Sequence, residues 1–432
     1  MVKGCNFKKN VLLYIIYFLL IERTPKTMAN IAILGFGVVG SGAVQVLTQN
    51  KKLIEEKTGN TVNIKYILDL REFPGNPFEH LIVHDFNTIL NDPEVDIVAE
   101  MMGGSHPAYD FSKACLEAGK SVVTSNKEVV SNFGTELLEI AKKNGVSYLF
   151  EASVGGGIPV IRPMCNDLSA NSITSVSGIL NGTTNYILTK MDTEGADFSD
   201  VLRDAQAKGY AEANPAADVE GIDAARKIVI LAALSFGKLI SPKAIHTEGI
   251  TSITREDVAI ARALGYSVKL IGHTRKLDGK ILAMVSPRLI PHSNPLSCIN
   301  DVFNGILVGG DMVGEVMFYG PGAGKLPTAS AVCADIVDIM AHKDTGVTLP
   351  EWVAATEDDV MSFDAYSCAR LFIFECACDK CAARCLSEFG DVKASRFEGG
   401  KLAIVSGEMT EAEAEAKANA SSFKLVKTIR IL

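Results

Sequence analysis

The chain has no excess of basic residues. Its 42 lysines and arginines stand against 51 aspartates and glutamates, so the 432 residues carry a formal net charge of −9. A nucleic-acid-binding face needs positive charge to neutralise phosphates, so nucleic acid is not expected as a partner. The chain also lacks an internal repeat, which excludes solenoids and propellers. Hydrophobic residues make up 47% and charged residues 22%, a composition typical of a folded globular chain.

The N-terminus lacks an apolar run long enough to span a bilayer. The run from Val11 to Ile21 follows a basic start and resembles a signal segment, but it is short for a spanning helix and has no small-x-small cleavage site. Met28 stands just before a predicted strand. We therefore expect residues 1–27 to be a leader or non-native extension, with a genuine anchor or signal as the alternative, and we expect no membrane partner.

A chain of this length exceeds a single core and predicts two or three domains. Strands alternating with helices over residues 28–150 predict a doubly wound parallel sheet of Rossmann type. Residues 151–323 predict an α+β domain with an open sheet, which would bind substrate and form a dimer. A helix at about 324–345 is expected to return to the first domain. Residues 350–432 have the βαββαβ order of a small ferredoxin-like module.

A glycine-rich turn directly follows the first predicted strand. Gly35, Gly37 and Gly40 have the spacing of the dinucleotide-binding fingerprint and stand between a strand and a helix, as that fingerprint requires. The glycines allow a tight turn and close approach of the backbone to a pyrophosphate at the helix N-terminus. The turn predicts NAD or NADP binding, with six candidate cofactor-binding residues: Gly35, Phe36, Gly37, Val38, Val39 and Gly40.

Four other residues bear on the cofactor. Asp69 ends the second strand and would suit the 2′-hydroxyl of NAD, whereas Arg71 could hold the 2′-phosphate of NADP; an ordinary surface pair is the alternative. We favour NADP, with dual use of NAD. Gly103 follows the next strand and would let the backbone approach the nicotinamide. Lys127 follows a further strand and could donate to the substrate or to the ribose.

An acidic stretch lies in the second domain. "GYAEANPAADVEGIDAARK" places Glu212, Asp218 and Asp223 close together and ends at Lys227, one helical turn beyond Asp223. An exposed helix with a weak ion pair is the simple interpretation. However, the apolar run after Lys227 indicates a largely buried helix, and a buried lysine among carboxylates is a candidate functional group.

Ten cysteines are present, five of them between residues 368 and 385. The size of the chain and its dinucleotide motif favour a reducing cytoplasm, where cysteines usually remain thiols. Cys376, Cys378, Cys381 and Cys385 have spacings found in zinc half-sites and redox pairs. We expect Cys376 and Cys378 to share one face of a strand and the other two to share a helix face, where all four would simply pack, and leave metal or redox chemistry as the alternative.

Four segments together resemble homoserine dehydrogenase: "TSNK", "EASVGGGIP", "NGTTNYIL" and "KGYAEANPAADVEGIDAARK". They occur in the expected order within residues 29 to 345. The resemblance implies NAD(P)-dependent interconversion of L-homoserine and L-aspartate 4-semialdehyde, in the biosynthesis of threonine, methionine and isoleucine. It also implies a cytoplasmic homodimer or homotetramer acting on a small molecule.

The resemblance further implies site residues. Lys227 would transfer the proton at the substrate oxygen, with Lys127 beside it. Glu212 and Asp223 would bind the substrate, Glu212 at its ammonium group, while Asp218 would support the lysine. Backbone and hydroxyl contacts would come from Gly182 and Thr183, and close backbone approach from Gly209 and Gly324.

Two accessory features follow from the same resemblance. A monovalent cation, usually sodium, would be held by Glu151 and the carbonyls of Val154, Gly156 and Ile158; a glycine-rich domain hinge is the alternative, or both. The C-terminal module resembles the ACT domain, which binds amino-acid effectors such as threonine. Here "CDKCAA" replaces the usual D-x-P-G turn, so a dimerisation role is equally compatible with the sequence.

Two rival functions use the same fold. An aspartate-semialdehyde dehydrogenase needs a cysteine nucleophile in the substrate domain, and neither Cys165 nor Cys298 has a suitable neighbourhood in the sequence. A non-catalytic amino-acid sensor would not need Lys127 and Lys227. Both features favour the dehydrogenase of homoserine over the rivals.

Overall fold

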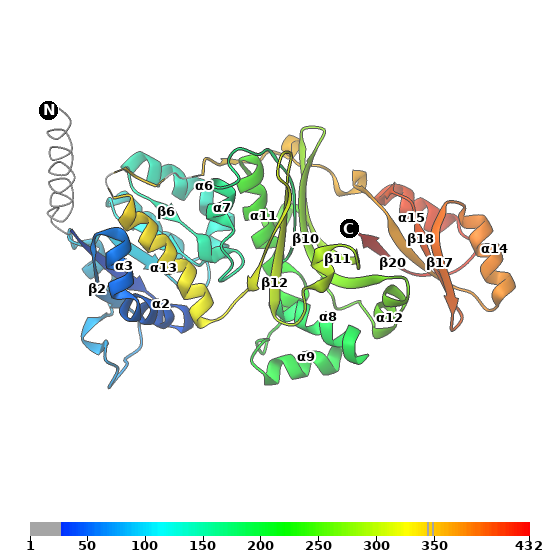
Figure 1. Cartoon of the computed structure of the whole chain (residues 1–432), viewed down its shortest axis with the longest axis horizontal. Coiled ribbons are helices and arrows are strands. Elements are labelled where there is room, and N and C mark those ends of the chain that lie inside the picture. Colours follow the sequence, from blue (N-terminus) through cyan, green and yellow to red (C-terminus); the bar gives the residue numbers. More distant parts are fainter. Residues whose placement is uncertain (1–26, 344, 348–349) are drawn as a thin grey trace, which may run out of the picture.

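The computed structural model describes residues 27–343, 345–347 and 350–432. The predicted N-terminal extension, residues 1–27, lies outside the described residues apart from Thr27. The described chain is elongated, with a nucleotide-binding domain at one end, a large sheet in the middle and a small C-terminal module at the other end (Figure 1).

The first sheet has six parallel strands in the order β3-β2-β1-β4-β5-β6. This is the strand order of the dinucleotide-binding fold, in which the order reverses between β1 and β4. The predicted doubly wound sheet of Rossmann type is therefore confirmed. Its strands are β1 (Met28–Leu34), β2 (Thr61–Leu68), β3 (Ile82–Val83), β4 (Ile97–Glu100), β5 (Ser121–Thr124) and β6 (Tyr148–Leu149).

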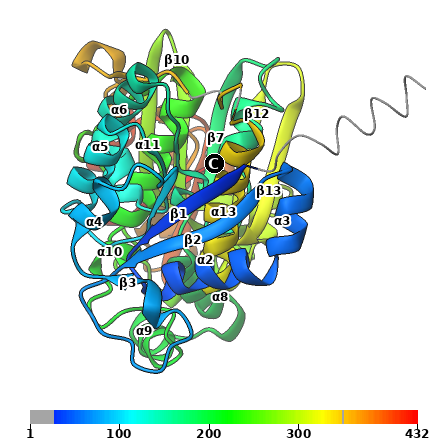
Figure 2. The ribbon, with the colours of Figure 1, turned by 90° about the vertical axis from the view of Figure 1, so that its left-hand side faces the viewer.

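Helices cover both faces of this sheet (Figure 2). One face carries α2 (Val38–Gln49), α3 (Lys51–Thr58) and α13 (Lys325–Ala341), and the other carries α4 (Phe86–Leu90), α5 (Ala108–Glu117) and α6 (Lys127–Asn144). Helix α13 comes from far along the chain and packs on α2, where Ala329 and Val332 share a core with Ala43 and Leu47. A Cβ added at Gly42 would lie 2.7 Å from the carbonyl oxygen of Lys325, so the two helices approach closely there.

The second sheet has ten strands, nine of them in the order β13-β12-β7-β10-β11-β20-β16-β18-β17. Helix α11 lies directly on β10, because a Cβ at Gly272 would be 3.2 Å from Cβ of Ile228. The first five strands of this order are β7 (Ile173–Ile179), β10 (Tyr266–Leu277), β11 (Lys280–Pro291), β12 (Phe303–Gly310) and β13 (Gly314–Pro321). The helices of this part of the chain are α7 (Ile161–Cys165), α8 (Gly182–Glu194), α9 (Phe198–Ala207), α10 (Ala216–Val219), α11 (Ile222–Phe236) and α12 (Arg255–Ala263). Short strands β8 (Lys238–Leu239), β9 (His246–Thr247) and β14 (Val353–Ala354) complete this region.

The C-terminal module has the predicted βαββαβ order and the strand order β20-β16-β18-β17 of a ferredoxin-like sheet. Its sheet continues into the large sheet, because β20 pairs in parallel with β11, with Arg430 opposite Arg288. Its elements are β16 (Arg370–Glu375), α14 (Asp379–Phe389), β17 (Val392–Glu398), β18 (Lys401–Ser406), α15 (Glu411–Ala420) and β20 (Leu425–Ile431), with the short strands β15 (Ser367–Cys368) and β19 (Met409–Thr410) beside them.

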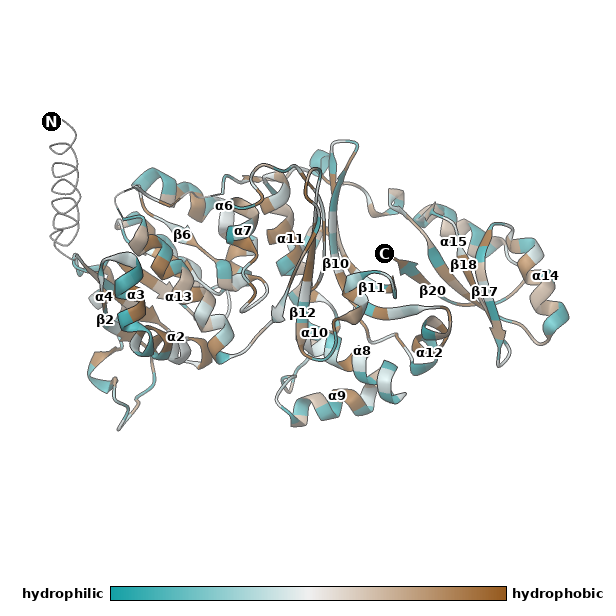
Figure 3. Cartoon of the chain, in the orientation of Figure 1, coloured by the Kyte–Doolittle hydropathy of each residue, from teal (hydrophilic) through white to brown (hydrophobic). Residues whose placement is uncertain are grey.

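Hydrophobic residues concentrate in the strands and on the inward faces of the helices, while the outer helices carry polar residues (Figure 3). In the part of the chain that the structure describes, no helix has both the length and the apolar character needed to cross a bilayer.

Candidate active site

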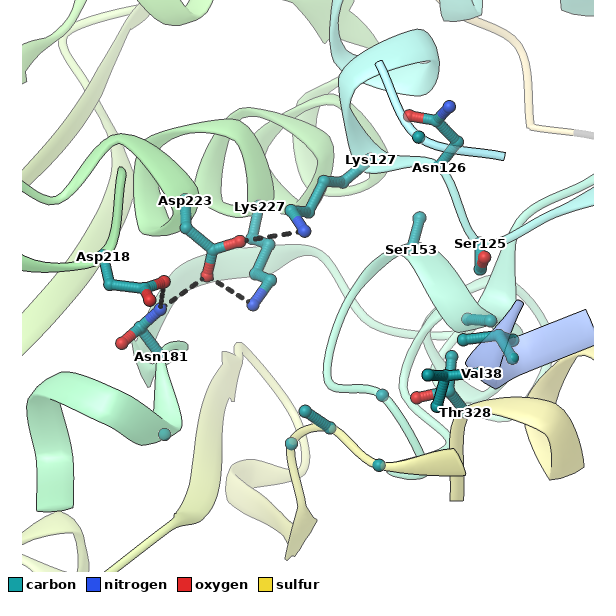
Figure 4. Close-up of a pocket in the computed structure, with 18 of the residues that line it drawn as sticks. Val38, Ser125, Asn126, Lys127, Ser153, Asn181, Asp218, Asp223, Lys227 and Thr328 are labelled. Atoms are coloured by element: carbon teal, nitrogen blue, oxygen red, sulfur yellow. Dashed lines mark hydrogen bonds and ion pairs between the residues drawn. The ribbon is translucent and has the colours of Figure 1, made fainter. Parts of the chain in front are cut away.

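A cavity of about 850 Å³ lies where the carboxyl ends of the first sheet face helices α8 and α11. Ligands of doubly wound sheets bind outside the carboxyl ends of the strands, where the strand order reverses. The cavity is at that position, so it is the candidate active site (Figure 4). Its lining includes Val38, Met101 and Ser125 from the first domain and Asn181, Asp223 and Lys227 from the second.

The glycine-rich turn between β1 and α2 borders this cavity through Val38 and Val39. Gly35 has φ +90°, which side chains rarely adopt, and a Cβ at Gly40 would lie 1.9 Å from the carbonyl oxygen of Gly35. At Gly37, which precedes α2, no side chain caps the helix. The turn therefore fits a phosphate group at the helix N-terminus.

Asp69 and Arg71 form an ion pair at the end of β2. The carboxylate of Asp69 accepts hydrogen bonds from Arg71 Nε at 2.9 Å and Nη2 at 2.8 Å, and from the backbone N–H of Phe36 at 2.8 Å. The Arg71 hydrogen bond is the main cause that holds the pKa of Asp69 well below its usual range. The Arg71 side chain is 63% exposed. Both residues lie outside the 850 Å³ cavity, beside the glycine-rich turn.

Helix α11 brings Lys227 and Asp223 into the cavity from the second domain. Lys227 Nζ donates to Asp223 Oδ2 and to the carbonyl of Leu180, both at 2.7 Å. Lys127 Nζ, from the start of α6 in the first domain, lies 3.1 Å from Asp223 Oδ1. One carboxylate thus joins two lysines from different domains, as the dashed lines in Figure 4 show.

Asn181 connects the remaining acidic residue to this cluster. Its side-chain amide donates to Asp218 Oδ1 at 2.7 Å and to Asp223 Oδ2 at 2.9 Å, and its Oδ1 caps α8 by accepting from the N–H of Thr184. Asn181 was not among the predicted site residues, although it precedes Gly182 in the quoted segment. The available signal was its place between a strand and a helix, where asparagine is a frequent N-cap.

Burial and charge shift the pKa values of this cluster. Burial lowers the pKa of Lys227 and outweighs the opposing effect of Asp223. For Asp223, burial alone would raise the pKa, but the charges of Lys227 and Lys127 outweigh it and lower the pKa. Burial raises the pKa of Asp218. The cluster therefore places the ionised Asp223 carboxylate beside a lysine that releases its proton more readily than an exposed one.

The other predicted site residues have different environments. Glu212 is exposed at the cavity mouth, and its carboxylate accepts no hydrogen bond among the described residues. The Thr183 hydroxyl donates to the carbonyl of Tyr210 at 2.6 Å. Gly182 allows a close backbone contact, since a Cβ there would lie 2.7 Å from the carbonyl of Val302. Gly103, Gly209, Gly324 and Gly156 line the cavity as well.

Glu100, at the end of β4, is a fully buried acid that was not among the predicted site residues. Its carboxylate accepts from the Met102 N–H at 2.7 Å and from the Thr124 hydroxyl at 2.6 Å. The Thr124 oxygen accepts from the N–H of Asn126, which caps the helix that carries Lys127. Burial raises the pKa of Glu100 to about 7. Glu100 therefore links the loop after β4 to the base of α6.

The predicted cation-binding segment follows β6. The carboxylate of Glu151 accepts from three backbone N–H groups at the start of α7, those of Val160, Ile161 and Arg162, at 2.7–2.8 Å. The carbonyls of Val154, Gly156 and Ile158 accept no backbone hydrogen bond among the described residues. Nowhere in residues 27–343, 345–347 and 350–432 do three histidine, cysteine or acidic side chains gather as a metal site.

The dinucleotide sheet, its glycine-rich turn and the lysine–carboxylate cluster at the switch point define a nicotinamide-dependent oxidoreductase. Residues 35–151 match the family model described as the NAD-binding domain of homoserine dehydrogenase, and residues 159–337 match the one described as homoserine dehydrogenase. The chain belongs to the homoserine dehydrogenase family, whose members are enzymes of amino-acid biosynthesis.

Known proteins support this assignment. A homoserine dehydrogenase of Bacillus subtilis (strain 168) is 42% identical over 322 residues, which is 74% of each chain. The crystal structure of a homoserine dehydrogenase from Thiobacillus denitrificans has a TM-score of 0.84 at 34% identity, covering 94% of this chain and 99% of that one. A mutant of a hyperthermophilic archaeal homoserine dehydrogenase in complex with NADPH has a TM-score of 0.64 at 28% identity, covering 74% of this chain and all of that one.

Proposed function

We propose that this cavity interconverts L-homoserine and L-aspartate 4-semialdehyde, with Lys227 transferring the proton. The observation that carries the proposal is the cluster at the switch point, where Asp223 joins Lys227 of the second domain to Lys127 of the first. A nicotinamide cofactor, when bound, accepts or donates the hydride at C4. The chain itself must bind the amino acid, orient its hydroxyl and move one proton.

The proton step follows from the charges around Lys227. In oxidation, the neutral amine accepts the proton of the substrate hydroxyl; in reduction, the ammonium stabilises the developing alkoxide and donates its proton. Burial lowers the pKa of Lys227, so a larger fraction is neutral near physiological pH than for an exposed lysine. The hydrogen bonds to Leu180 and Asp223 fix the direction of Nζ and leave its third donor for the substrate.

Recognition of the substrate needs groups for both ends of a zwitterion. Glu212 lies at the cavity mouth without a protein partner for its carboxylate among the described residues, which supports a role in binding the substrate ammonium group. Lys127 is 37% exposed and meets only one oxygen of Asp223, so it retains donors for the substrate or the ribose. Asp218 accepts a hydrogen bond from the Asn181 side chain and acts on Lys227 through its charge.

The cofactor residues support NADP, with NAD as a second cofactor. The open N-terminus of α2 fits the pyrophosphate, and Asp69 anchors the turn through the Phe36 N–H. The exposed guanidinium of Arg71 is the available cation for a 2′-phosphate. Its ion pair with Asp69 offsets the acid that would otherwise repel that phosphate, so one site can serve both cofactors.

We also propose that the chain binds a monovalent cation, and that its ligands are backbone carbonyl oxygens. Because the Glu151 carboxylate is engaged by α7, Glu151 would contribute its carbonyl oxygen, beside the carbonyls of Val154, Gly156 and Ile158. Hard cations prefer oxygen ligands, and carbonyls without protein donors supply them. Activity measured in sodium buffers and in buffers with only a large organic cation tests this; equal activity and equal thermal stability in both would contradict the site.

We further propose a homodimer or homotetramer, formed through the second domain. The edge strand β13 exposes Met317 and Tyr319, and Met312 next to it is 81% exposed. Apolar side chains on a sheet edge favour association of subunits. Light scattering of the purified chain gives the mass; a monomer at micromolar concentration would contradict this proposal.

One assay tests the main function: homoserine-dependent reduction of NADP, repeated with NAD and with threonine added. We expect NADP to be reduced with homoserine and not with 2-aminobutyrate, an analogue that lacks the hydroxyl group. Phosphorylating oxidation of aspartate semialdehyde without homoserine activity would instead indicate an aspartate-semialdehyde dehydrogenase. A decrease in rate with threonine would show an effector site in the ACT-like module.

A further inference from the structure

Two cysteines of the C-terminal module meet at the start of α14. Cys378 is the N-cap of that helix and Cys381 lies in its first turn, with 3.0 Å between the two Sγ atoms. Cys378 is exposed and Cys381 is partly exposed. Both therefore lie where a soluble reagent can reach them, about as close as two unbonded sulfur atoms come.

This arrangement differs from the one expected. Strand β16 ends at Glu375, so the prediction that Cys376 and Cys378 share a strand face is wrong. Cys376 and Cys385 are buried in the core between α14 and the sheet, as the packing interpretation requires. Cys378 is exposed outside that core, and Cys381 is only partly buried at its edge, so packing does not explain why the two sulfur atoms meet.

The surroundings of Cys378 and Cys381 shift the pKa values of the two thiols in opposite directions. Cys378 Sγ accepts a hydrogen bond from the backbone N–H of Cys381 at 3.4 Å and caps a helix of 11 residues, whose N-terminus favours negative charge. The hydrogen bond with the Cys381 side chain lowers the pKa of Cys378 and raises that of Cys381. By contrast, burial raises the pKa of Cys385 to about 12. A thiol that ionises more readily than a free cysteine, beside a second thiol, is the arrangement of an exchanging dithiol.

We propose that Cys378 and Cys381 form a reversible dithiol–disulfide site that exchanges with an external disulfide, such as oxidised glutathione. The Cys378 thiolate attacks one sulfur of the external disulfide, forms a mixed disulfide and expels one thiolate. Cys381 loses its proton and attacks Cys378 Sγ, which releases the second thiolate. The two cysteines are oxidised, the external disulfide is reduced to two thiols, and the two protons end on those thiols.

The rival explanation is a zinc half-site. It needs further ligands, and among the described residues no third histidine, cysteine or acidic side chain joins this pair as a metal site. The buried pair Cys376 and Cys385 is a second rival for disulfide formation, since these thiols also interact. The experiment must therefore identify the bonded sulfurs.

The sequence allows that identification by trypsin, which cleaves after lysine and arginine. Cleavage after Arg370, Lys380, Arg384 and Lys393 places Cys376 and Cys378 on peptide 371–380, Cys381 on 381–384 and Cys385 on 385–393. The full-length chain is equilibrated with oxidised glutathione, blocked with an alkylating reagent and digested without reductant. Peptide 371–380 linked to 381–384 is expected, and dithiothreitol should separate them.

Variants decide which sulfurs are bonded. The linked peptide should disappear in Cys378→Ser and Cys381→Ser and persist in Cys376→Ser and in the control Cys298→Ser, which removes a lone exposed cysteine. Before oxidation, Cys378 should alkylate roughly tenfold faster than Cys298. A link from 371–380 to 385–393, equal alkylation rates, or stoichiometric zinc that is lost in Cys378→Ser would overturn the proposal.

Discussion

Asp223 and Lys227 lie one turn apart on α11, with Lys227 Nζ 2.7 Å from Asp223 Oδ2. The other oxygen of the same carboxylate is 3.1 Å from Lys127 Nζ, which belongs to the nucleotide-binding domain. A single acid thus opposes the effect of burial on the pKa of Lys227, the residue proposed to transfer the proton, and connects the two domains across the cavity. Single substitutions can therefore test the role of each side chain in this cluster.

Lys227→Ala should abolish turnover while cofactor binding stays nearly intact. The variant loses the proton donor and acceptor, a role worth roughly 10²–10⁴-fold in rate. The turnover number and the cofactor dissociation constant, from fluorescence titration, check this. Lys190→Ala, which removes a partly exposed lysine on α8 outside the cavity, is the matched control. If cofactor affinity falls together with turnover, Lys227 has a different role.

Asp223→Asn should move the pH profile of homoserine oxidation toward lower pH. The Asp223 carboxylate opposes the effect of burial on Lys227, so its removal lowers the pKa of Lys227 further. The amine is then neutral at lower pH, and the rising limb of kcat/KM shifts in that direction while its plateau falls. Asp218→Asn should give a smaller shift, since Asp218 affects Lys227 less. An unchanged pH profile in Asp223→Asn would show that another group limits the rate.

Arg71→Ala should weaken the use of NADP and spare the use of NAD. Loss of a charge-assisted contact to the 2′-phosphate costs roughly tenfold to a hundredfold in kcat/KM. The variant also leaves the Asp69 carboxylate unneutralised, which disfavours the phosphate but not a 2′-hydroxyl. Steady-state kinetics with both cofactors give the ratio, with Arg203→Ala as an exposed-arginine control. Equal losses with both cofactors would assign Arg71 to the turn rather than to the phosphate.

Glu100→Gln should remove a pH dependence of stability. The pKa of Glu100 is raised by burial from 4.5 to about 7, so between these values the folded state keeps a proton that the unfolded state releases. Stability is therefore lost as pH rises through this window, by about 3 kcal/mol in total. Urea midpoints of wild type and variant at about pH 5 and about pH 8 check this, because the variant should be relatively more stable at the higher pH.

The control for this titration is Glu117→Gln, an exposed glutamate at the end of α5. Its urea midpoint should follow that of the wild type at both pH values. Should Glu100→Gln lose as much stability at high pH as at low pH, the acid would be ionised in the folded protein throughout.

The sequence by itself determined the nucleotide-binding sheet and the acidic stretch. The glycine spacing depends on neighbours in the chain: Gly35 needs a positive φ, and Gly40 must lie against Gly35. The alternation of strands and helices is likewise local, so the confirmed Rossmann-type sheet could be predicted. Asp223 and Lys227 share a helix face through their spacing alone.

Only the tertiary structure decided which partners those side chains meet. Asn181 bridges Asp218 to Asp223 because β7 and α11 belong to one packed domain, and no local pattern records that contact. The contacts of Asp69 with the Phe36 N–H, of Glu151 with α7 and of Glu100 with Thr124 depend in the same way on where separate elements end. Hydrophobic periodicity fixes elements, whereas hydrogen bonds between elements arise only after they have packed.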